Sequence, residues 1–421
     1  HNDTQNRIVF YHNRSLSACK AGMLIRGEKD CSSTSCGAPC STALFLASWL
    51  WYNTDINGKG IIKMAKVLIA MSGGVDSSVA AYLCVKGGYD CMGVTMKLYA
   101  NEDIGLSREH TCCSLSDTED ARSVAARLGI PYYVFNFSGD FADKVIRKFI
   151  ATYEAGATPN PCIDCNRYLK FGKLFQRMRE LNCDYVATGH YARIRKEGDR
   201  YLLLKGLDAT KDQSYVLYGM TQEELAHTLF PLGEYRKSET RKIAEENGFL
   251  NAKKHDSQDI CFVPDGDYGK FIETYTGKFF PPGNFVDGEG RVLGRHKGIQ
   301  RYTVGQRRGL GLALPEPLYV RELRPWDNTV VLGRDEELFS RSLDAGEMNW
   351  IAWEMPPKEF RAKAKVRYRH PEQWATVTST GPDTIRLVFD EPQRAITAGQ
   401  AVVLYDGDTV LGGGTIQLSK E

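Results

Sequence analysis

Short apolar runs alternate with amphipathic stretches between residues 64 and 265, a pattern typical of a parallel sheet with helices on both of its faces. Residues 117–128 are predicted to form a helix, because this stretch has an acidic first turn and Gly129 as a C-terminal stop. The predicted strands are the β-branched and aromatic runs at residues 67–70, 91–96, 132–137 and 185–188. The pattern therefore predicts an α/β domain over residues 64–265.

The pattern changes after this domain. Gly and Pro are dense and the strand-like runs are short over residues 266–336. Beyond Ala352, apolar and polar residues alternate in period two, with turn signals at Gly381-Pro382 and at residues 412–414. Because such alternation indicates strands with one buried face, we expect a small central β-rich module over residues 266–336 and a second one over residues 340–421.

The first 63 residues differ from the remainder, since they mix Ser, Asn and Cys without helical or strand periodicity. Met64 stands directly before the first predicted strand and has the position of a natural translation start. We therefore expect residues 1–63 to be an extension, either read through from upstream or poorly ordered. A genuine accessory segment is the alternative.

Composition limits the class of protein. The chain has 421 residues, of which 42% are hydrophobic and 25% are charged, as in globular proteins of two to four domains. Its net charge of +2 means that a nucleic-acid partner would need a local basic surface. No apolar run reaches the roughly 18 residues of a membrane-spanning helix, so we expect no membrane partner. The 12 cysteines, in a long chain without a secretion signal, favour reduced thiols and a cytoplasmic location.

A glycine-rich string, SGGVDSS at residues 72–78, joins the first predicted strand to a helix. Two glycines allow the backbone to approach an anion, and the amides that open the helix would face that anion. No P-loop lysine follows, which argues against ordinary hydrolysis of a γ-phosphate. The string predicts a pyrophosphate-binding loop in which Asp76 lies near Mg²⁺ or the loop backbone. A Gly-Gly turn without a ligand is the alternative.

Three cysteines are candidates for chemistry. Cys162 and Cys165 lie in the proline-punctuated string TPNPCIDCN at residues 158–166, directly before an amphipathic stretch, and Cys261 lies in a polar turn beside an apolar strand. A cysteine just before a helix has its thiol pKa lowered by free amides, which suits a nucleophile. Persulfide chemistry also needs two sulfurs close together, which sequence separation neither forbids nor shows. From spacing alone, half of a zinc site with Cys261 as a buried residue is an equal alternative.

A basic alternation marks the C-terminal module. Over residues 360–369, odd positions are cationic and even positions are apolar or aromatic. As a strand, this would place five cations on one face about 6.6 Å apart, a spacing comparable with that of successive RNA phosphates. The alternative is a solvated edge strand whose cations prevent aggregation. Residues 300–308 add cations in the central module, which favours an RNA-binding surface.

The string at residues 72–78 resembles the fingerprint of the PP-loop ATP pyrophosphatase superfamily. From Met64 onward, the chain resembles the tRNA-uridine 2-sulfurtransferases (tRNA-specific 2-thiouridylases), which place sulfur at C2 of the wobble uridine (U34). The segments that carry this resemblance are SGGVDSS, TPNPCIDCN, ATGHY (187–191), GLD (206–208) with KDQSY (211–215), ICF (260–262), YTVGQRRGLG (302–311) and TAGQ (397–400).

The resemblance implies an adenine-nucleotide alpha-hydrolase-like (PP-loop) catalytic domain over residues 64–265, a central tRNA-binding module over residues 266–336 and a C-terminal β-barrel over residues 340–421. The residues that it implies for ATP are Ala70, Met71, Ser72, Gly73, Gly74, Val75, Asp76, Ser77, Met96 and Gly189. Those that it implies around the target base are Asn160, Pro161 and Cys162. Those that it implies to contact or position tRNA are His190, Lys211, Asp212, Gln213, Arg367, Tyr368 and Gln400.

The resemblance also implies a reaction. ATP, with Mg²⁺, would adenylate the uracil O2, and the persulfide sulfur of Cys261 would reach C2 by direct attack or as sulfide, with Cys165 as the nucleophile. AMP and pyrophosphate would leave, and a disulfide between Cys165 and Cys261 would await reduction. An upstream sulfur donor would supply the persulfide.

One departure from the family pattern leaves alternatives open. The family commonly has Asp where this chain has Cys162, and Asp164 could replace that carboxylate. Cys162, Cys165 and Cys261 could instead ligate a [4Fe-4S] cluster. Two rival functions are a PP-loop amidotransferase or ligase for a small carboxylate or purine, and a non-catalytic tRNA-binding iron-sulfur protein.

Overall fold

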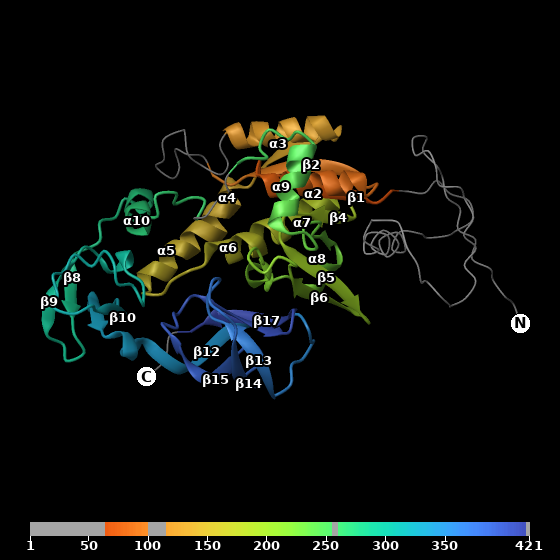
Figure 1. Cartoon of the computed structure of the whole chain (residues 1–421). Helices are drawn as coiled ribbons and strands as arrows, with labels where there is room; N and C mark the ends of the chain where they lie inside the picture. The colour runs from red at the N-terminus through yellow and green to blue at the C-terminus, as the bar shows by residue number, and fades with distance from the viewer. Residues whose placement is uncertain (1–63, 100–114, 255–259, 418–421) are drawn as a thin grey trace, which may run out of the picture. The chain divides into compact units, whose positions relative to one another are not determined.

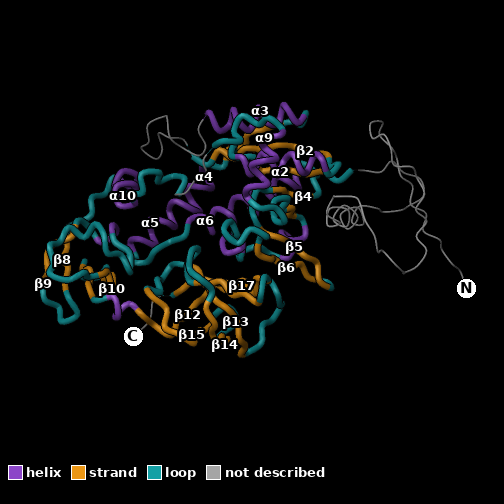
Figure 2. Tube along the Cα trace, viewed as in Figure 1, coloured by secondary structure: helices purple, strands orange, loops and turns teal. Residues whose placement is uncertain are grey.

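The computed structural model of the chain describes residues 64–99, 115–254 and 260–417 (Figures 1 and 2). Residues 1–63, for which an extension was expected, lie outside the described residues. Among the described residues, none of the helices is long and apolar enough to cross a membrane.

A parallel five-stranded sheet forms the first domain, in the order β3-β2-β1-β4-β7 (Figure 1). Its strands are β1 (Lys66–Ala70), β2 (Asp90–Lys97), β3 (Tyr132–Asn136), β4 (Tyr185–Ala187) and β7 (Thr228–Leu229). The first four confirm the predicted strands to within one residue at each end. The fifth was not predicted, because a strand of two residues has no periodicity to detect.

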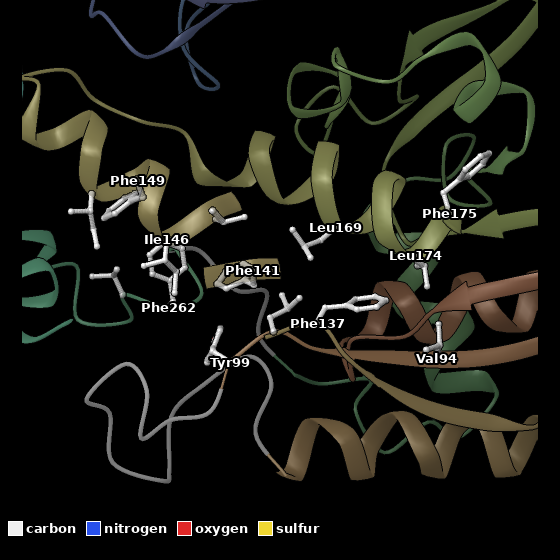
Figure 3. Close-up of a cluster of buried hydrophobic side chains, with 14 of the residues drawn as sticks. Val94, Tyr99, Phe137, Phe141, Ile146, Phe149, Leu169, Leu174, Phe175 and Phe262 are labelled. Atoms are coloured by element: carbon white, nitrogen blue, oxygen red, sulfur yellow. The ribbon is translucent and has the colours of Figure 1, made fainter. Parts of the chain in front are cut away.

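Helices cover both faces of this sheet, as predicted. Val67 and Ile69 of β1 pack on one face with helices α2 (Val75–Lys86), α3 (Leu115–Leu128) and α9 (Lys237–Glu246). Leu68 points to the other face, which it shares with α4 (Ser138–Phe141), η2 (Ala142–Ile146), α5 (Arg147–Glu154) and α7 (Leu174–Glu180). Figure 3 shows this second cluster, in which Phe141 and Phe149 lie close to Phe262, the residue after Cys261.

The cysteine segment is helical earlier than predicted. Helix α6 (Pro161–Asp164) continues directly into the π-helix η3 (Cys165–Lys173) and then into α7, so the helix begins at Pro161 and not after residue 166. Pro161 suits the first helical position, because its fixed φ is helical and its missing N–H has no partner there in any case. The proline that suggested a loop therefore starts the helix.

A hairpin of β5 (Ala192–Glu197) and β6 (Arg200–Lys205), with η4 (Ser214–Leu217) and α8 (Gln222–Ala226), follows β4. The central module has α10 (Tyr268–Thr276) and a sheet in the order β10-β11-β8-β9. The strands of that sheet are β8 (Gly283–Val286), β9 (Val292–His296), β10 (Tyr319–Arg324) and β11 (Thr329–Gly333), with the short helices η5 (Ile299–Arg301) and η6 (Asp335–Leu338).

The C-terminal module is a closed antiparallel barrel, because β12 pairs with both β15 and β17. Its strands are β12 (Phe339–Trp350), β13 (Glu359–Lys365), β14 (Gln373–Ser379), β15 (Ile385–Arg394), β16 (Ala401–Asp406) and β17 (Thr409–Ile416). Strand β6 of the first domain joins β17 where Leu204 lies opposite Thr409. The fold inferred from the resemblance, a PP-loop domain followed by a central β-rich module and a β-barrel, is confirmed.

The predicted basic strand is shorter than its alternation suggested. The apolar residues Ala362 and Ala364 are buried, as predicted, but β13 ends at Lys365. The chain then turns, and the His370 amide donates to the Arg367 carbonyl at 3.1 Å. The strand therefore carries three of the five expected cations, and Arg367 and Arg369 lie in the turn.

Candidate active site

The glycine-rich loop lies at the carboxyl end of β1, where the strand order changes direction between β2 and β4. Gly74 is the N-cap of α2, and the hydroxyls of Ser77 and Ser78 both donate to its carbonyl at 3.0 Å. The Ser72 amide in turn donates to Ser77 Oγ at 3.1 Å. The carboxyl edge of a parallel sheet at such a switch point is where α/β proteins bind nucleotides, and the first amides of α2 lack partners within the helix.

A second loop contacts the first. Gly189 follows β4, and a Cβ atom on it would lie 2.8 Å from both the Asp76 carbonyl carbon and the Ser77 nitrogen. No side chain fits there without backbone movement. The structure thus brings Gly189, one of the residues implied for ATP, against the backbone of the loop. Met96, on the neighbouring strand β2, packs on the same core as Ala70.

Asp76 does not fit the role of a Mg²⁺ ligand in this structure. Both of its carboxylate oxygens accept hydrogen bonds from Lys237 Nζ at 2.8 Å, and Oδ1 also accepts one from the Tyr191 hydroxyl at 2.8 Å. An ammonium thus takes the position that a cation would occupy. We derive no step through a metal at Asp76.

Lys237 and Asn251 support the loop, and sequence reasoning missed both. Lys237 is only 8% exposed, and Asn251 is 3% exposed. The Asn251 amide donates to the Gly73 carbonyl at 2.8 Å and to Ser78 Oγ at 2.9 Å. Because these residues lie more than 150 positions downstream of the loop, no local pattern could have identified them.

The loop that precedes the cysteines is held by the C-terminal barrel. The Thr158 amide donates to the Ala398 carbonyl at 2.8 Å. Gln400 Nε2 donates to the carbonyls of Thr158 and Pro159 at 3.0 and 3.1 Å. Gly399 has a φ of 84°, and a Cβ atom there would lie 3.0 Å from the Thr158 carbonyl oxygen. The side chain of Gln400, implied to contact tRNA, therefore binds the cysteine loop.

The three candidate cysteines differ in exposure. Cys162, in the first turn of α6, is exposed, whereas Cys165 and Cys261 are half-buried. Cys165 and Cys261 pack against the same apolar cluster, the one drawn in Figure 3. The backbone carbonyl of Cys261 accepts a hydrogen bond from the buried Tyr99 hydroxyl at 2.7 Å. The fold thus brings two cysteines that are distant in sequence to one side of the sheet.

The expectation of a lowered thiol pKa is wrong for Cys165. Burial raises the pKa of this thiol to about 11, although the positive charge of Lys170 opposes the shift. The helix begins at Pro161, so the amide of Cys165 is not among the most exposed amides of the first turn. Cys162, in the first turn, is instead the cysteine whose negative charge the helix dipole would stabilise.

Asp164 does not replace the carboxylate that is missing at position 162. Residues two apart on an α-helix point about 200° apart, so Asp164 faces away from Cys162. It is 5% exposed and accepts a hydrogen bond from Lys148 Nζ at 2.8 Å. Burial raises the pKa of Asp164, and Lys148 partly opposes that shift.

The cysteines do not form a cluster-binding set. Among the residues that the structure describes, no group of three or more His, Cys, Asp or Glu side chains could hold a metal ion. Cys162, Cys165 and Cys261 therefore do not fit a [4Fe-4S] cluster as they are placed. We derive no step through one.

His190 is buried and has partners at both ring nitrogens. Nδ1 lies 2.7 Å from Thr188 Oγ1, and Nε2 lies 3.3 Å from Lys170 Nζ. Burial lowers the pKa of this histidine well below its usual value, so the ring is neutral. This environment favours a structural role for His190 over contact with tRNA.

Several other residues implied for tRNA form hydrogen bonds within the protein, and one of these bonds joins the first domain to the barrel. The Tyr368 hydroxyl donates to the Asp212 carbonyl at 3.1 Å, and Gln213 Oε1 accepts from the Tyr191 amide at 3.0 Å. Arg367 Nη2 donates to the Arg394 carbonyl at 2.8 Å. These contacts bring Asp212 together with Tyr368, and they use several of the polar groups expected to face RNA.

On the outer face of β13, Arg361 and Lys363 flank the ring of Trp374, at 5.7 and 5.6 Å from its centroid. Arg361 also forms an ion pair with Asp390 at 2.6 Å. One of the three strand cations is therefore neutralised, and the surface combines positive charge with an exposed aromatic ring.

Comparisons with known proteins cover most of the chain. Family models match at residues 65–265 (tRNA methyl transferase HUP domain), 269–334 (tRNA methyl transferase PRC-barrel domain) and 340–416 (Aminomethyltransferase beta-barrel domain).

The tRNA-specific 2-thiouridylase MnmA of Clostridioides difficile (strain 630) is 51% identical over 356 residues, which are 84% of this chain and 98% of that protein. The same enzyme of Symbiobacterium thermophilum is 51% identical over 376 residues, 87% of this chain and 95% of its own length. That of Carboxydothermus hydrogenoformans is 51% identical over 360 residues, 85% and 99% of the two chains. Among solved structures, a 4-thiouridine synthetase in complex with RNA and with bound ATP is 20% identical with a TM-score of 0.31, over 48% of this chain and 45% of that one.

Proposed function

We propose specific roles for the residues of this chain, which belongs to the tRNA-specific 2-thiouridylase family. The chain is thus an ATP-dependent tRNA sulfurtransferase that forms 2-thiouridine. The observation that carries the premise is identity of about half of all residues over nearly the whole length of the relatives. Within that activity, the wobble uridine (U34) is the nucleotide that we assign as the target.

The glycine-rich loop is assigned to ATP. The first amides of α2 and the Ser77 side chain would hold the outer phosphates, and Gly189 would keep the neighbouring loop close enough to enclose the nucleotide. With the outer two phosphates held, the uracil O2 attacks the α-phosphorus and pyrophosphate leaves. Adenylation turns O2 into a leaving group, AMP. Mg²⁺ would accompany the ATP phosphates, without Asp76 as a ligand.

Sulfur transfer is assigned to Cys261 and Cys165. A donor leaves a persulfide on Cys261, and its terminal sulfur bonds to C2 as the C2–O2 bond breaks and AMP departs. The Cys165 thiolate then attacks the inner sulfur of Cys261, which releases the thiouridine and forms a Cys165–Cys261 disulfide. Release of sulfide by Cys165 before attack on C2 gives the same products. In both routes the outer sulfur gains two electrons and the two cysteines lose them, so a reductant must restore the thiols.

The high pKa of Cys165 bears on this step. A thiol with a pKa of about 11 is almost fully protonated at neutral pH. Cys165 therefore needs a proton acceptor in the tRNA-bound enzyme, or a change in its surroundings that strengthens the pKa-lowering effect of the Lys170 charge.

Domain roles follow from the same premise. We assign residues 64–265 to catalysis, residues 266–336 to a central tRNA-binding module and residues 340–421 to the barrel, with residues 211–213, 367 and 368 at or near bound tRNA. The contacts between Gln400 and the cysteine loop support a positioning role for the barrel.

The test is direct. The full chain is incubated with unmodified tRNA, ATP, Mg²⁺ and a persulfide donor, and the tRNA nucleosides are analysed by mass spectrometry. We expect 2-thiouridine at position 34, one pyrophosphate for each thiolation, and no product with Cys165→Ala. Pyrophosphate release without a thiolated nucleoside would overturn the proposal in favour of another PP-loop ligase.

A further inference from the structure

A cavity of about 380 Å³ lies between the cysteine segment and the C-terminal barrel. Its wall includes Asn160, Asp164 and Arg167 from the cysteine segment, Lys148 from α5, and Glu347 from the barrel. Asn160 is also one of the residues that the family resemblance implies around the target base. The cavity therefore adjoins the base site without containing either Cys162 or Cys165.

Three of the four charged groups that line the cavity have partners. Lys148 and Asp164 form an ion pair at 2.8 Å, and Glu347 accepts a hydrogen bond from Thr415 Oγ1 at 2.9 Å. Arg167 makes no hydrogen bond or ion pair with any of the residues that the structure describes. A guanidinium carries five N–H donors, so Arg167 has donors that a ligand in the cavity can use.

Arg167 is nevertheless held in place by its surroundings. Its Cζ lies 5.6 Å from the centroid of the buried Tyr218 ring, an arrangement typical of a cation–π contact. A Cβ atom on Gly219 would lie 2.7 Å from Arg167 Nε, so a residue with a side chain there would displace the guanidinium. The side chain is thus oriented without a direct ion pair, although its charge acts at longer range on Asp164 and Glu224. An oriented guanidinium with open donors is the state expected of a preformed anion-binding group.

We propose that Arg167 binds a phosphate of the tRNA backbone that flanks the target nucleotide. The inference rests on the proposed function and adds a residue and a contact to it. A planar guanidinium matches two phosphate oxygens in a bidentate arrangement. A base extruded from its stack remains covalently joined to its phosphates, so a base near Asn160 brings a phosphodiester to the adjoining space.

The carboxylates of the cavity do not prevent this binding. Lys148 balances the charge of Asp164 through their ion pair at 2.8 Å. Glu347 is the remaining negative charge, and its contact with Thr415 fixes one of its oxygens on the barrel side.

The first test measures the affinity for unmodified tRNA by filter binding at several KCl concentrations. We expect Arg167→Met to weaken binding about tenfold or more and to reduce the slope of log K against log [KCl] by about one. Arg167→Lys should keep most of the slope, because it keeps the charge. Arg147→Met, on the exposed start of α5, makes the same change in net charge and should leave both quantities close to those of the wild type.

The second test replaces the phosphate. An anticodon stem-loop RNA with one neutral methylphosphonate on either side of the target uridine should bind the wild type about as weakly as Arg167→Met binds the unmodified RNA. Combining the two changes should cost no more than either alone, since they remove the same contact. Fully additive losses at both flanking positions, or an unchanged salt slope in a variant that still binds ATP, would overturn the inference.

The thiolation assay on the wild type distinguishes a failure of the phosphate contact from a failure of the proposed function. If the wild type forms 2-thiouridine and Arg167→Met keeps the salt slope, only the phosphate contact is wrong. If the wild type forms no 2-thiouridine, the proposed function itself is wrong.

Discussion

The glycine-rich loop and the cysteine loop are built by opposite means. Residues 72–78 are closed by hydrogen bonds from Ser72, Ser77 and Ser78, all within the same string. Thr158 and Pro159 are held by Ala398 and Gln400, which belong to a different module. The nucleotide half of the site is therefore completed within the first domain, by contacts inside the string and by Lys237 and Asn251, whereas the sulfur half needs the barrel. The two halves should then respond separately to mutation.

The largest difference between the effect on thiolation and the effect on ATP affinity is expected when the cysteine sulfurs are removed. Cys165→Ser and Cys261→Ser should each lower 2-thiouridine formation at least about 1,000-fold, because an alcohol cannot carry or release the transferred sulfur. ATP affinity, measured by equilibrium dialysis, should stay within about twofold of the wild type. Cys183→Ser, at a buried cysteine in the core, serves as the control for loss of a thiol. Full thiolation by either catalytic variant would remove that cysteine from the mechanism.

A substitution at Gly189 should instead affect the nucleotide half of the site. Gly189→Ala places a methyl group 2.8 Å from the backbone of Asp76 and Ser77, so the two loops must separate. We expect ATP affinity to fall about tenfold or more, with a smaller loss in tRNA affinity. Gly139→Ala is the matched control, because nothing lies within 4 Å of a Cβ atom there. Unchanged ATP binding in a folded Gly189→Ala protein would show that Gly189 does not shape the nucleotide site.

Gln400 tests whether the barrel positions the cysteine loop or contacts RNA. Gln400→Leu removes two hydrogen bonds to that loop, each worth about 1 kcal/mol, so kcat for thiolation should fall by up to about 30-fold. The KM for tRNA and the affinity for ATP should change little. Gln176→Leu, at an exposed glutamine on α7, is the control. A higher KM with an unchanged kcat would instead identify Gln400 as a tRNA contact.

The smallest expected effect concerns the protonation of Cys165. With a pKa of about 11, its alkylation rate in the tRNA-free protein should rise about tenfold per pH unit between pH 8 and 10. Lys170→Met removes a charge that lowers this pKa, so the profile should move to still higher pH, whereas Lys170→Arg should not move it. Peptide mass spectrometry resolves Cys165 from the other cysteines. A plateau near pH 8 would mean that the thiol is activated without tRNA.

The sequence predicted best what local patterns control. The four longer strands and α3 follow from apolar runs and a terminal glycine, and SGGVDSS forms the expected turn between β1 and α2. The start of α6 could not be derived from proline alone, since Pro161 can end a loop or begin a helix. The predicted basic strand was too long, because the alternation of cationic and apolar residues continues into a turn after Lys365.

The environment of the site was less accessible to sequence reasoning. The pKa of Cys165 depends on its burial against a cluster that residues of α4, α5, α7 and Phe262 build together. The ion pair between Asp76 and Lys237 joins residues 161 positions apart, so it changes the role expected for Asp76 without any local signal. These features arise from tertiary packing and not from motif spacing.

The hydrogen bonds from Gln400 to Thr158 and Pro159 also set an order of events during synthesis. A ribosome makes Thr158 242 residues before Gln400, an interval of roughly 10 to 50 s at typical elongation rates. The nucleotide pocket can form while the barrel is still being translated, but the cysteine loop has no anchor until then. A chain interrupted before the barrel would therefore retain the means to bind ATP without the arrangement that moves sulfur.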